Sequence, residues 1–185
     1  QPLTGDTNLL QVLPSRPFAS YPTNDGLFVP YSGTRMLHLE VDGTVISDQS
    51  LSTLPLSTYG TCNDASGALM FGKTSGQNAF IGRLNESGTG FTWIDSIDYG
   101  NETYFSGVTV LDDGDLLVCG TSYVMGTDLR PIIRRLTADG DGIWTHVAPT
   151  GQITRATHAR ELENGDFIVT GLDGPPVPSA IKLLC

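Results

Sequence analysis

The amino-acid sequence predicts an all-β fold built from many short strands. Short apolar runs recur along its 185 residues, and 22 Gly and 11 Pro are spread between them. Gly and Pro placed in this way are typical of tight turns between strands. The hydrophobic share of 39% is enough to form a core, and the length is that of one domain. We therefore expect a single domain over residues 1–185.

One repeated segment consists of a polar turn centred on Asp-Gly or Asn-Gly, then an apolar run, then Gly or another small residue. Its clearest copies are 111–120 and 162–171, and more diverged copies lie at 63–72 and 23–31. The turn glycines are separated by 41, 47 and 51 residues, and they are Gly26, Gly67, Gly114 and Gly165. Asn-Gly or Asp-Gly between alternating apolar residues is a strong signal for a β-hairpin.

A second segment lies between these copies, an apolar strand that ends in a turn and often leads into a strand with Trp. Its copies are 36–43, 80–88 followed by Trp93, 132–140 followed by Trp144, and the shorter 180–185. Units of 40–50 residues with about four strands are typical of propeller blades. We predict a small four-bladed β-propeller with units at 35–75, 79–123, 130–173, and 178–185 joined with 1–33. The closing blade, shared between the N- and C-terminal segments, would hide sheet edges.

The repeat resembles those of secreted β-propeller proteins of the delta-60, WD40-like and kelch-like kinds. The resemblance rests on Leu-x-Asp/Asn-Gly-Asp-apolar-apolar-Val-x-Gly and on the later Arg-Leu-x-x-Asp-Gly-x-x-x-Trp of residues 135–144. It implies a propeller fold and a surface, adhesive or scaffold role, and it transfers no functional residues. A weaker similarity to the Asp-box of sialidase-like propellers fails at Thr89, which stands where that motif has Asp.

The charge balance narrows the classes of partner. Twenty Asp and Glu against ten Lys and Arg give a net charge of −10. This argues against nucleic acid and anionic lipid as partners, because both require clustered basic residues. It is compatible with calcium, with a basic partner, or with solubility alone. No apolar run approaches the ~18 residues of a membrane span, so membrane insertion is not expected.

Several features predict an extracellular or cell-surface glycoprotein. Two N-glycosylation sequons begin at Asn85 and Asn101 in segments expected to be loops. The first residue is Gln, as signal-peptide removal would leave it, although a trimmed chain would look the same. The three cysteines allow one disulfide with one remaining thiol, or an intermolecular bond, and they are Cys62, Cys119 and Cys185. Cys185 could latch the closing blade or link two molecules.

Two groups of residues raise the question of ligand binding. Arg155, His158 and Arg160 could form a small anion site, but strict strand alternation would place Arg155 on the opposite face from the other two. We expect a hydrogen-bonded strand face instead. The acidic runs 112–115 and 139–142 are candidate calcium-binding sites, yet neither has the full residue spacing of a calcium-binding loop. Asp and Asn are also the residues that hairpin turns demand, so turns are predicted there and no cofactor is expected.

No catalytic residues are predicted. The chain lacks a Gly-x-Ser-x-Gly nucleophile motif, and its three histidines, His38, His146 and His158, form no close-spaced metal pair. Trp93 and Trp144 occupy equivalent places in adjacent units and are expected to pack between blades rather than bind sugars.

The function predicted on this basis is a non-catalytic extracellular structural, scaffold or adhesion module. It could self-assemble into fibres through its terminal strands, or bind other extracellular proteins or glycans. The alternatives are a lectin-like propeller that uses Tyr99, Tyr104 or Tyr123, and a glycan-acting hydrolase.

Overall fold

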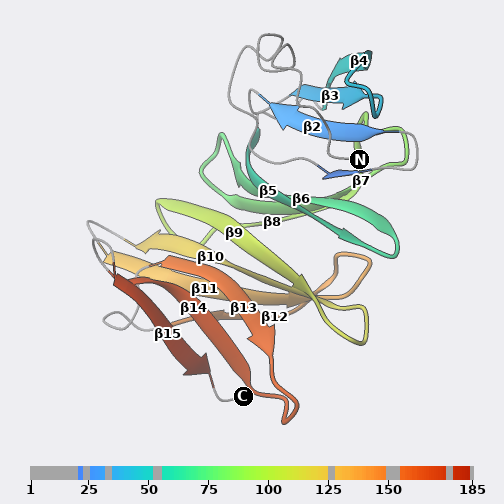
Figure 1. Ribbon diagram of the computed structural model, residues 1–185. Coiled ribbons are helices and arrows are strands. Elements are labelled where there is room, and N and C mark those ends of the chain that lie inside the picture. The colour runs from blue at the N-terminus through green and yellow to red at the C-terminus, as the bar shows by residue number, and fades with distance from the viewer. Residues whose placement is uncertain are drawn as a thin grey trace.

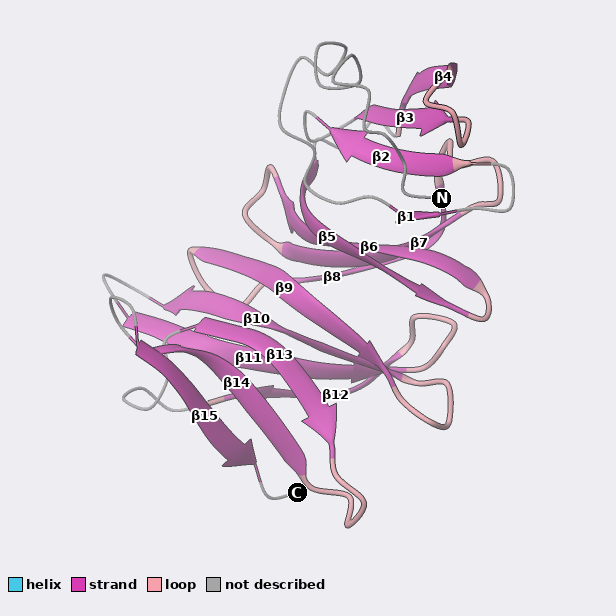
Figure 2. Ribbon diagram, viewed as in Figure 1, coloured by secondary structure: helices cyan, strands magenta, loops and turns pink. Residues whose placement is uncertain are grey.

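The structure is a computed structural model, and it describes residues 21–22, 26–31, 35–51, 56–124, 128–148, 155–173 and 177–183. These residues form fifteen strands and no helix, which confirms the all-β prediction (Figure 2). Within the described ranges there is consequently no helix that could cross a membrane.

The strands form four antiparallel sheets, each made from strands consecutive in the chain. The first two sheets contain β1 (Tyr21–Pro22), β2 (Leu27–Tyr31), β3 (Arg35–Leu39) and β4 (Val45–Ser50), then β5 (Leu56–Asp64), β6 (Gly67–Thr74), β7 (Ala79–Leu84) and β8 (Phe91–Ile97). The last two contain β9 (Glu102–Val110), β10 (Leu116–Val124), β11 (Asp128–Leu136) and β12 (Gly142–Val147), then β13 (Arg155–Glu161), β14 (Phe167–Asp173) and β15 (Val177–Leu183).

The sheets follow one another in a row, from β1–β4 at one end to β13–β15 at the other (Figure 1). Among the described strands the row does not close into a ring. Among the described residues, the two parts of the predicted closing blade do not pair, because β15 pairs with β14 while β1 and β2 belong to the first sheet. The fourth sheet has three described strands, where each of the others has four.

The sheets and the predicted repeat units differ in phase. The unit predicted at 35–75 begins with β3 and ends with β6, so it takes two strands from each of two sheets. The phases differ because a repeating series of strands and turns can be divided into units of four strands at any starting strand. The Asp/Asn-Gly hairpin joins the first two strands of a sheet, as at 111–115 between β9 and β10, whereas it lies near the end of a predicted unit such as 79–123.

The closing glycine of the sequence repeat has a clear structural reason. The first strand of each of the last three sheets, here called a leading strand (β5, β9 and β13), carries one extra residue in a β-bulge. At the bulge the backbone of the leading strand closely approaches the facing glycine. A Cβ on Gly120 would lie 1.9 Å from the carbonyl oxygen of Tyr104, and Gly72 and Gly171 are equally crowded. Only glycine fits there.

Three of the four apolar clusters lie between sheets, and the fourth belongs to β2 and β3 of the first sheet. One cluster joins the second and third sheets and includes Phe71, Ile81, Phe105 and Ile132. Another joins the third and fourth sheets through residues such as Leu117 and Phe167, and a smaller one joins the first and second. Trp93 packs against the first of these clusters and Trp144 against the second, as the sequence predicted.

Candidate functional site

The leading strands position the exposed groups best placed to meet a ligand. Their bulged residues are Tyr59 in β5, Ser106 in β9 and Thr157 in β13. The extra residue changes which side chains face outward after it. Tyr59 is 38% exposed as a result, whereas its neighbours Thr58 and Gly60 are buried.

Tyr59 belongs to a polar and aromatic cluster that spans the second and third sheets. Its ring lies edge-on to that of Tyr104, with the ring centroids 5.2 Å apart. Beside them Lys73 Nζ lies 2.5 Å from Glu102 Oε1 and also donates a hydrogen bond to Gln77 Oε1 at 3.0 Å. Partial burial raises the pKa of Tyr59 although nearby Lys73 opposes the rise, and the hydrogen bond to Glu102 raises the pKa of Lys73.

This arrangement combines a π-face with charged hydrogen-bonding groups. A sugar ring could stack on Tyr59 while its hydroxyls reach Lys73 and Glu102. Of the three tyrosines predicted for a lectin, Tyr104 lies in the cluster, Tyr99 is 41% exposed on the β8–β9 loop, and Tyr123 is partly buried in β10. Tyr59, Lys73 and Glu102 could not be singled out from the sequence, because only the bulge makes Tyr59 face outward.

The basic residues of β13 lie differently from the prediction. Ala156 and Ala159 are buried, whereas Arg155, His158 and Arg160 are all exposed. The bulge at Thr157 inserts one residue between Ala156 and His158, so Arg155 joins the face of the other two. Strict alternation was the wrong rule for this strand.

Of the two acidic runs considered for calcium, 112–115 holds an arginine. Asp113 Oδ2 and Asp115 Oδ2 accept hydrogen bonds from Arg135 at 2.5 and 2.8 Å, and Asp113 Oδ1 also accepts one from the Asp115 backbone N–H. Within the described ranges no group of His, Cys, Asp and Glu is arranged to hold a metal ion. The carboxylates of 112–115 therefore stabilise a turn and tie it to β11.

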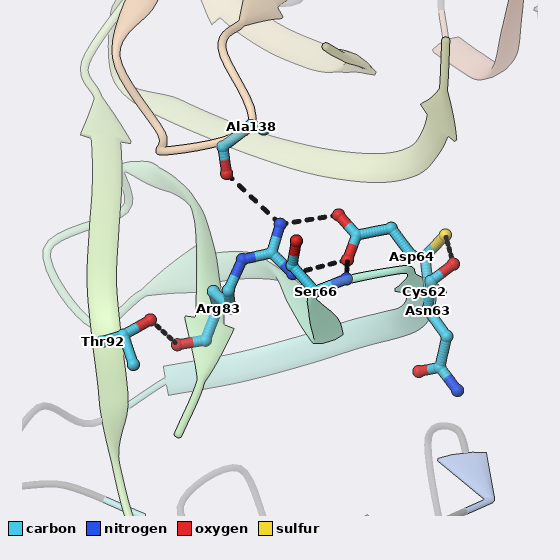
Figure 3. Close-up of polar contacts among 7 residues, drawn as sticks. All are labelled: Cys62, Asn63, Asp64, Ser66, Arg83, Thr92 and Ala138. Carbon is cyan, nitrogen blue, oxygen red and sulfur yellow. Dashed lines mark hydrogen bonds and ion pairs between the residues drawn. The ribbon is translucent and has the colours of Figure 1, made fainter. Parts of the chain in front are cut away.

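The preceding sheet carries a related but more buried pair. Arg83 donates two hydrogen bonds of 2.6 Å to the two carboxylate oxygens of Asp64, and their side chains are only 8% and 7% exposed (Figure 3). Arg83 also donates to the carbonyl oxygen of Ala138 at 3.2 Å, which links the second sheet to the third. The Arg83 hydrogen bonds hold the pKa of Asp64 below its ordinary value, against the effect of burial.

The two sequons differ in how available their asparagines are. The carboxamide of Asn85 is engaged inside its own turn, where its oxygen accepts hydrogen bonds from Ser87 Oγ and the Thr89 N–H at 3.1 and 3.0 Å. Asn101 lies exposed on the β8–β9 loop, and its backbone N–H donates to the carbonyl oxygen of Tyr123. Asn101 is therefore the more accessible acceptor.

The described cysteines are both free thiols, so the structure shows no disulfide between Cys62 and Cys119. They cannot meet because they pack in different intersheet clusters. Burial raises the pKa of Cys119 to about 12. Burial and then the Asp64 carboxylate raise that of Cys62. Cys185 lies outside the described residues.

The histidines do not come together. His38 stacks on Phe28 in the first sheet, with ring centroids 4.1 Å apart, His146 is exposed on β12, and His158 is exposed on β13.

Comparison with known proteins assigns no family to the chain. No protein-family model matches it, and no curated protein matches it. Among solved structures it is similar to PorZ, an essential bacterial surface component of the type-IX secretion system of Porphyromonas gingivalis. That similarity has 16% identity and a TM-score of 0.47, and it covers 88% of this chain and 26% of that one. It is also similar to hydrazine synthase of Kuenenia stuttgartiensis, with 13% identity, a TM-score of 0.43, and coverage of 92% and 58%.

Proposed function

We propose that this chain is a non-catalytic extracellular structural or adhesion module whose four sheets are blades of a β-propeller. The observation that carries the proposal is the use made of its charged side chains. Asp64, Asp95, Asp113 and Asp115 are each bound to an arginine that connects strands or sheets. The groups best suited to acid–base chemistry thus contribute to the framework.

The blade interpretation is supported by the repetition of local geometry. Three leading strands carry a bulge at the same place, and each bulge faces a crowded glycine. Neighbouring sheets bury apolar side chains between their faces, as propeller blades do. Surface location and glycosylation are supported by the exposed sequon at Asn101.

Fibre formation through the terminal strands is part of this proposal. The fourth sheet has three described strands, and β15 pairs only with β14 among them. An unpaired edge of this kind can accept a strand from another molecule. A chain that stays monomeric at high concentration by analytical ultracentrifugation would exclude this form of the proposal.

Electron microscopy and intact mass before and after deglycosylation test the proposed function on protein from a eukaryotic secretory host. We expect carbohydrate mass that disappears in Asn101→Gln and persists in the matched variant Asn85→Gln. Filaments would identify a structural polymer. Intracellular retention together with the bare polypeptide mass would contradict the extracellular glycoprotein.

A carbohydrate-binding role is the second candidate, favoured by the exposed Tyr59 ring beside Tyr104 and the Lys73–Glu102 pair. A glycan array of the wild-type chain and of Tyr59→Ala tests it. Binding that is lost in Tyr59→Ala but kept in Tyr99→Ala would support this cluster, and an array without any bound glycan would count against it.

A further inference from the structure

The exposed face of β13 and β14 carries a row of nitrogen donors. Arg155, His158 and Arg160 pair with Leu172, Thr170 and Ile168, which are successive alternate residues of β14. The three side chains therefore follow one another at about 7 Å intervals along the strand, given its rise of about 3.3 Å per residue. We call Arg155, His158 and Arg160 the basic row.

The basic row departs from the preceding sheets. The equivalents of His158 and Arg160 in the third sheet are Gly107 and Thr109, which follow the bulge of β9 and contact the next leading strand. Thr109 Oγ1 donates to the carbonyl oxygen of Ala159 at 2.6 Å, and a Cβ on Gly107 would meet the carbonyl oxygen of Thr157. The fourth sheet has His158 and Arg160 at these positions. Another sheet packed there would bury a guanidinium group, which is costly without a paired carboxylate.

The basic row also differs from other arginines of this acidic protein. Arg35, Arg83, Arg134 and Arg135 each hold a carboxylate. Within the described part of the chain, no hydrogen bond or ion pair neutralises Arg155, His158 or Arg160. Two unneutralised guanidinium groups on one face, in a chain of net charge −10, are suited to an anionic partner.

We propose that the basic row binds a linear anionic polysaccharide whose carboxylate or sulfate groups lie along β13. Each guanidinium can donate two parallel hydrogen bonds to such a group, and the imidazole of His158 supplies a donor between them. Thr170, also exposed on this face, offers a hydroxyl for a sugar. This inference names the ligand class of the proposed adhesion module and so rests on its extracellular location.

A second copy of the chain is a weaker occupant. The turn carboxylates of Asp64, Asp113 and Asp115, which a second copy could offer to the basic row, are already bound to arginines. Acidic residues lie beyond one end of the row. Arg160 lines a hollow of about 940 Å³ whose other lining residues include Asp112, Glu161 and Glu163. The polysaccharide would therefore extend from Arg160 toward Arg155, away from these acids.

Isothermal titration of the full chain with polygalacturonate, dextran sulfate and neutral dextran tests the proposal. We expect binding to one or both charged polymers, which separates carboxylate from sulfate recognition, and none to dextran. Arg155→Gln and Arg160→Gln should each weaken the apparent Kd roughly tenfold. The matched variant Arg35→Gln removes the same charge from a paired, exposed site and should change the Kd less than twofold. Because the side chains of Arg155 and Arg160 are exposed, Arg155→Gln and Arg160→Gln should keep the wild-type thermal unfolding midpoint.

Three results would overturn the proposal. These are no binding of either charged polysaccharide, an equal loss of affinity in Arg35→Gln, or tighter binding of poly-glutamate than of both polysaccharides, which would indicate an acidic protein partner. None of them bears on the carbohydrate mass or the filaments by which the extracellular module itself is tested. The two proposals can therefore fail independently.

Discussion

At the scale of single residues, burial decides what an ion pair contributes. The Arg83 and Asp64 side chains are almost fully buried, whereas those of Arg35 and Asp48 are 43% and 39% exposed. An exposed pair contributes about 0–1 kcal/mol, because water screens it. Removing one partner of a buried pair leaves an uncompensated charge and typically costs about 3–5 kcal/mol.

Asp64→Asn should therefore lower the free energy of unfolding by about 3–5 kcal/mol, because Arg83 stays buried without its carboxylate. Asp48→Asn, its matched control, should lower it by less than about 1 kcal/mol. Urea unfolding followed by circular dichroism measures both. Equal effects of the two variants would mean that the Arg83–Asp64 pair is solvated in solution.

The Arg83–Asp64 pair also makes the stability of the fold depend on pH in the acid range. The folded pKa of Asp64 lies below its unfolded value of about 3.9, so the carboxylate stabilises the fold fully above that value. The contribution is lost as the pH falls below about 4 toward the folded pKa. Unfolding curves between pH 7 and pH 2 should show a steeper loss of stability in the wild type than in Asp64→Asn.

Cys119 should resist alkylation in the folded protein. Its side chain is fully buried and its pKa is raised to about 12, so almost no thiolate exists at pH 8. Mass spectrometry after N-ethylmaleimide treatment should show modification of Cys119 only when the protein is unfolded in urea. Rapid labelling of the native chain at Cys119 would mean that the third and fourth sheets separate readily.

At the scale of elements, the bulge connects a sequence motif to a geometry. The repeated hairpins and their closing glycines could be predicted from the sequence, because Asp/Asn-Gly turns and apolar alternation are local signals. The bulge could not, since an extra residue such as Thr157 leaves no local mark. The bulge in β13 therefore places Arg155 on the opposite face from the one expected. The bulge in β5 makes Tyr59 face outward, which the sequence did not indicate.

Gly120→Ala tests the bulge. The added Cβ would collide with the Tyr104 carbonyl in the backbone of β9, which can yield only if the bulge rearranges. We expect a loss of about 1–3 kcal/mol or more in stability. Gly114→Ala, the control, meets no atom within 4 Å and is penalised only by its φ of +89°, about 1 kcal/mol. If chemical denaturation ranked the two variants in reverse, the close approach would not be a constraint.

At the scale of the whole molecule, the sheets depend on one another. Because three of the four apolar clusters lie between sheets, neighbouring sheets must form together to bury them. The all-β class could be predicted from composition and turns. The phase of the sheets and the open row could not, because a strand repeat is compatible with any starting strand. Only the long-range packing between leading strands such as β9 and β13 determines at which strand each sheet begins.

Phe105→Ala should measure this dependence. Phe105 is fully buried in the cluster between the second and third sheets, and its truncation should cost about 3–5 kcal/mol. Ile143→Ala, at a position 49% exposed, should cost far less. If the sheets form one cooperative unit, hydrogen exchange in the Phe105 variant should accelerate together in β6 and in β13, on both sides of the altered sheet. Acceleration confined to β9–β12 would mean that each sheet unfolds by itself, and the intersheet clusters would then contribute little to cooperativity.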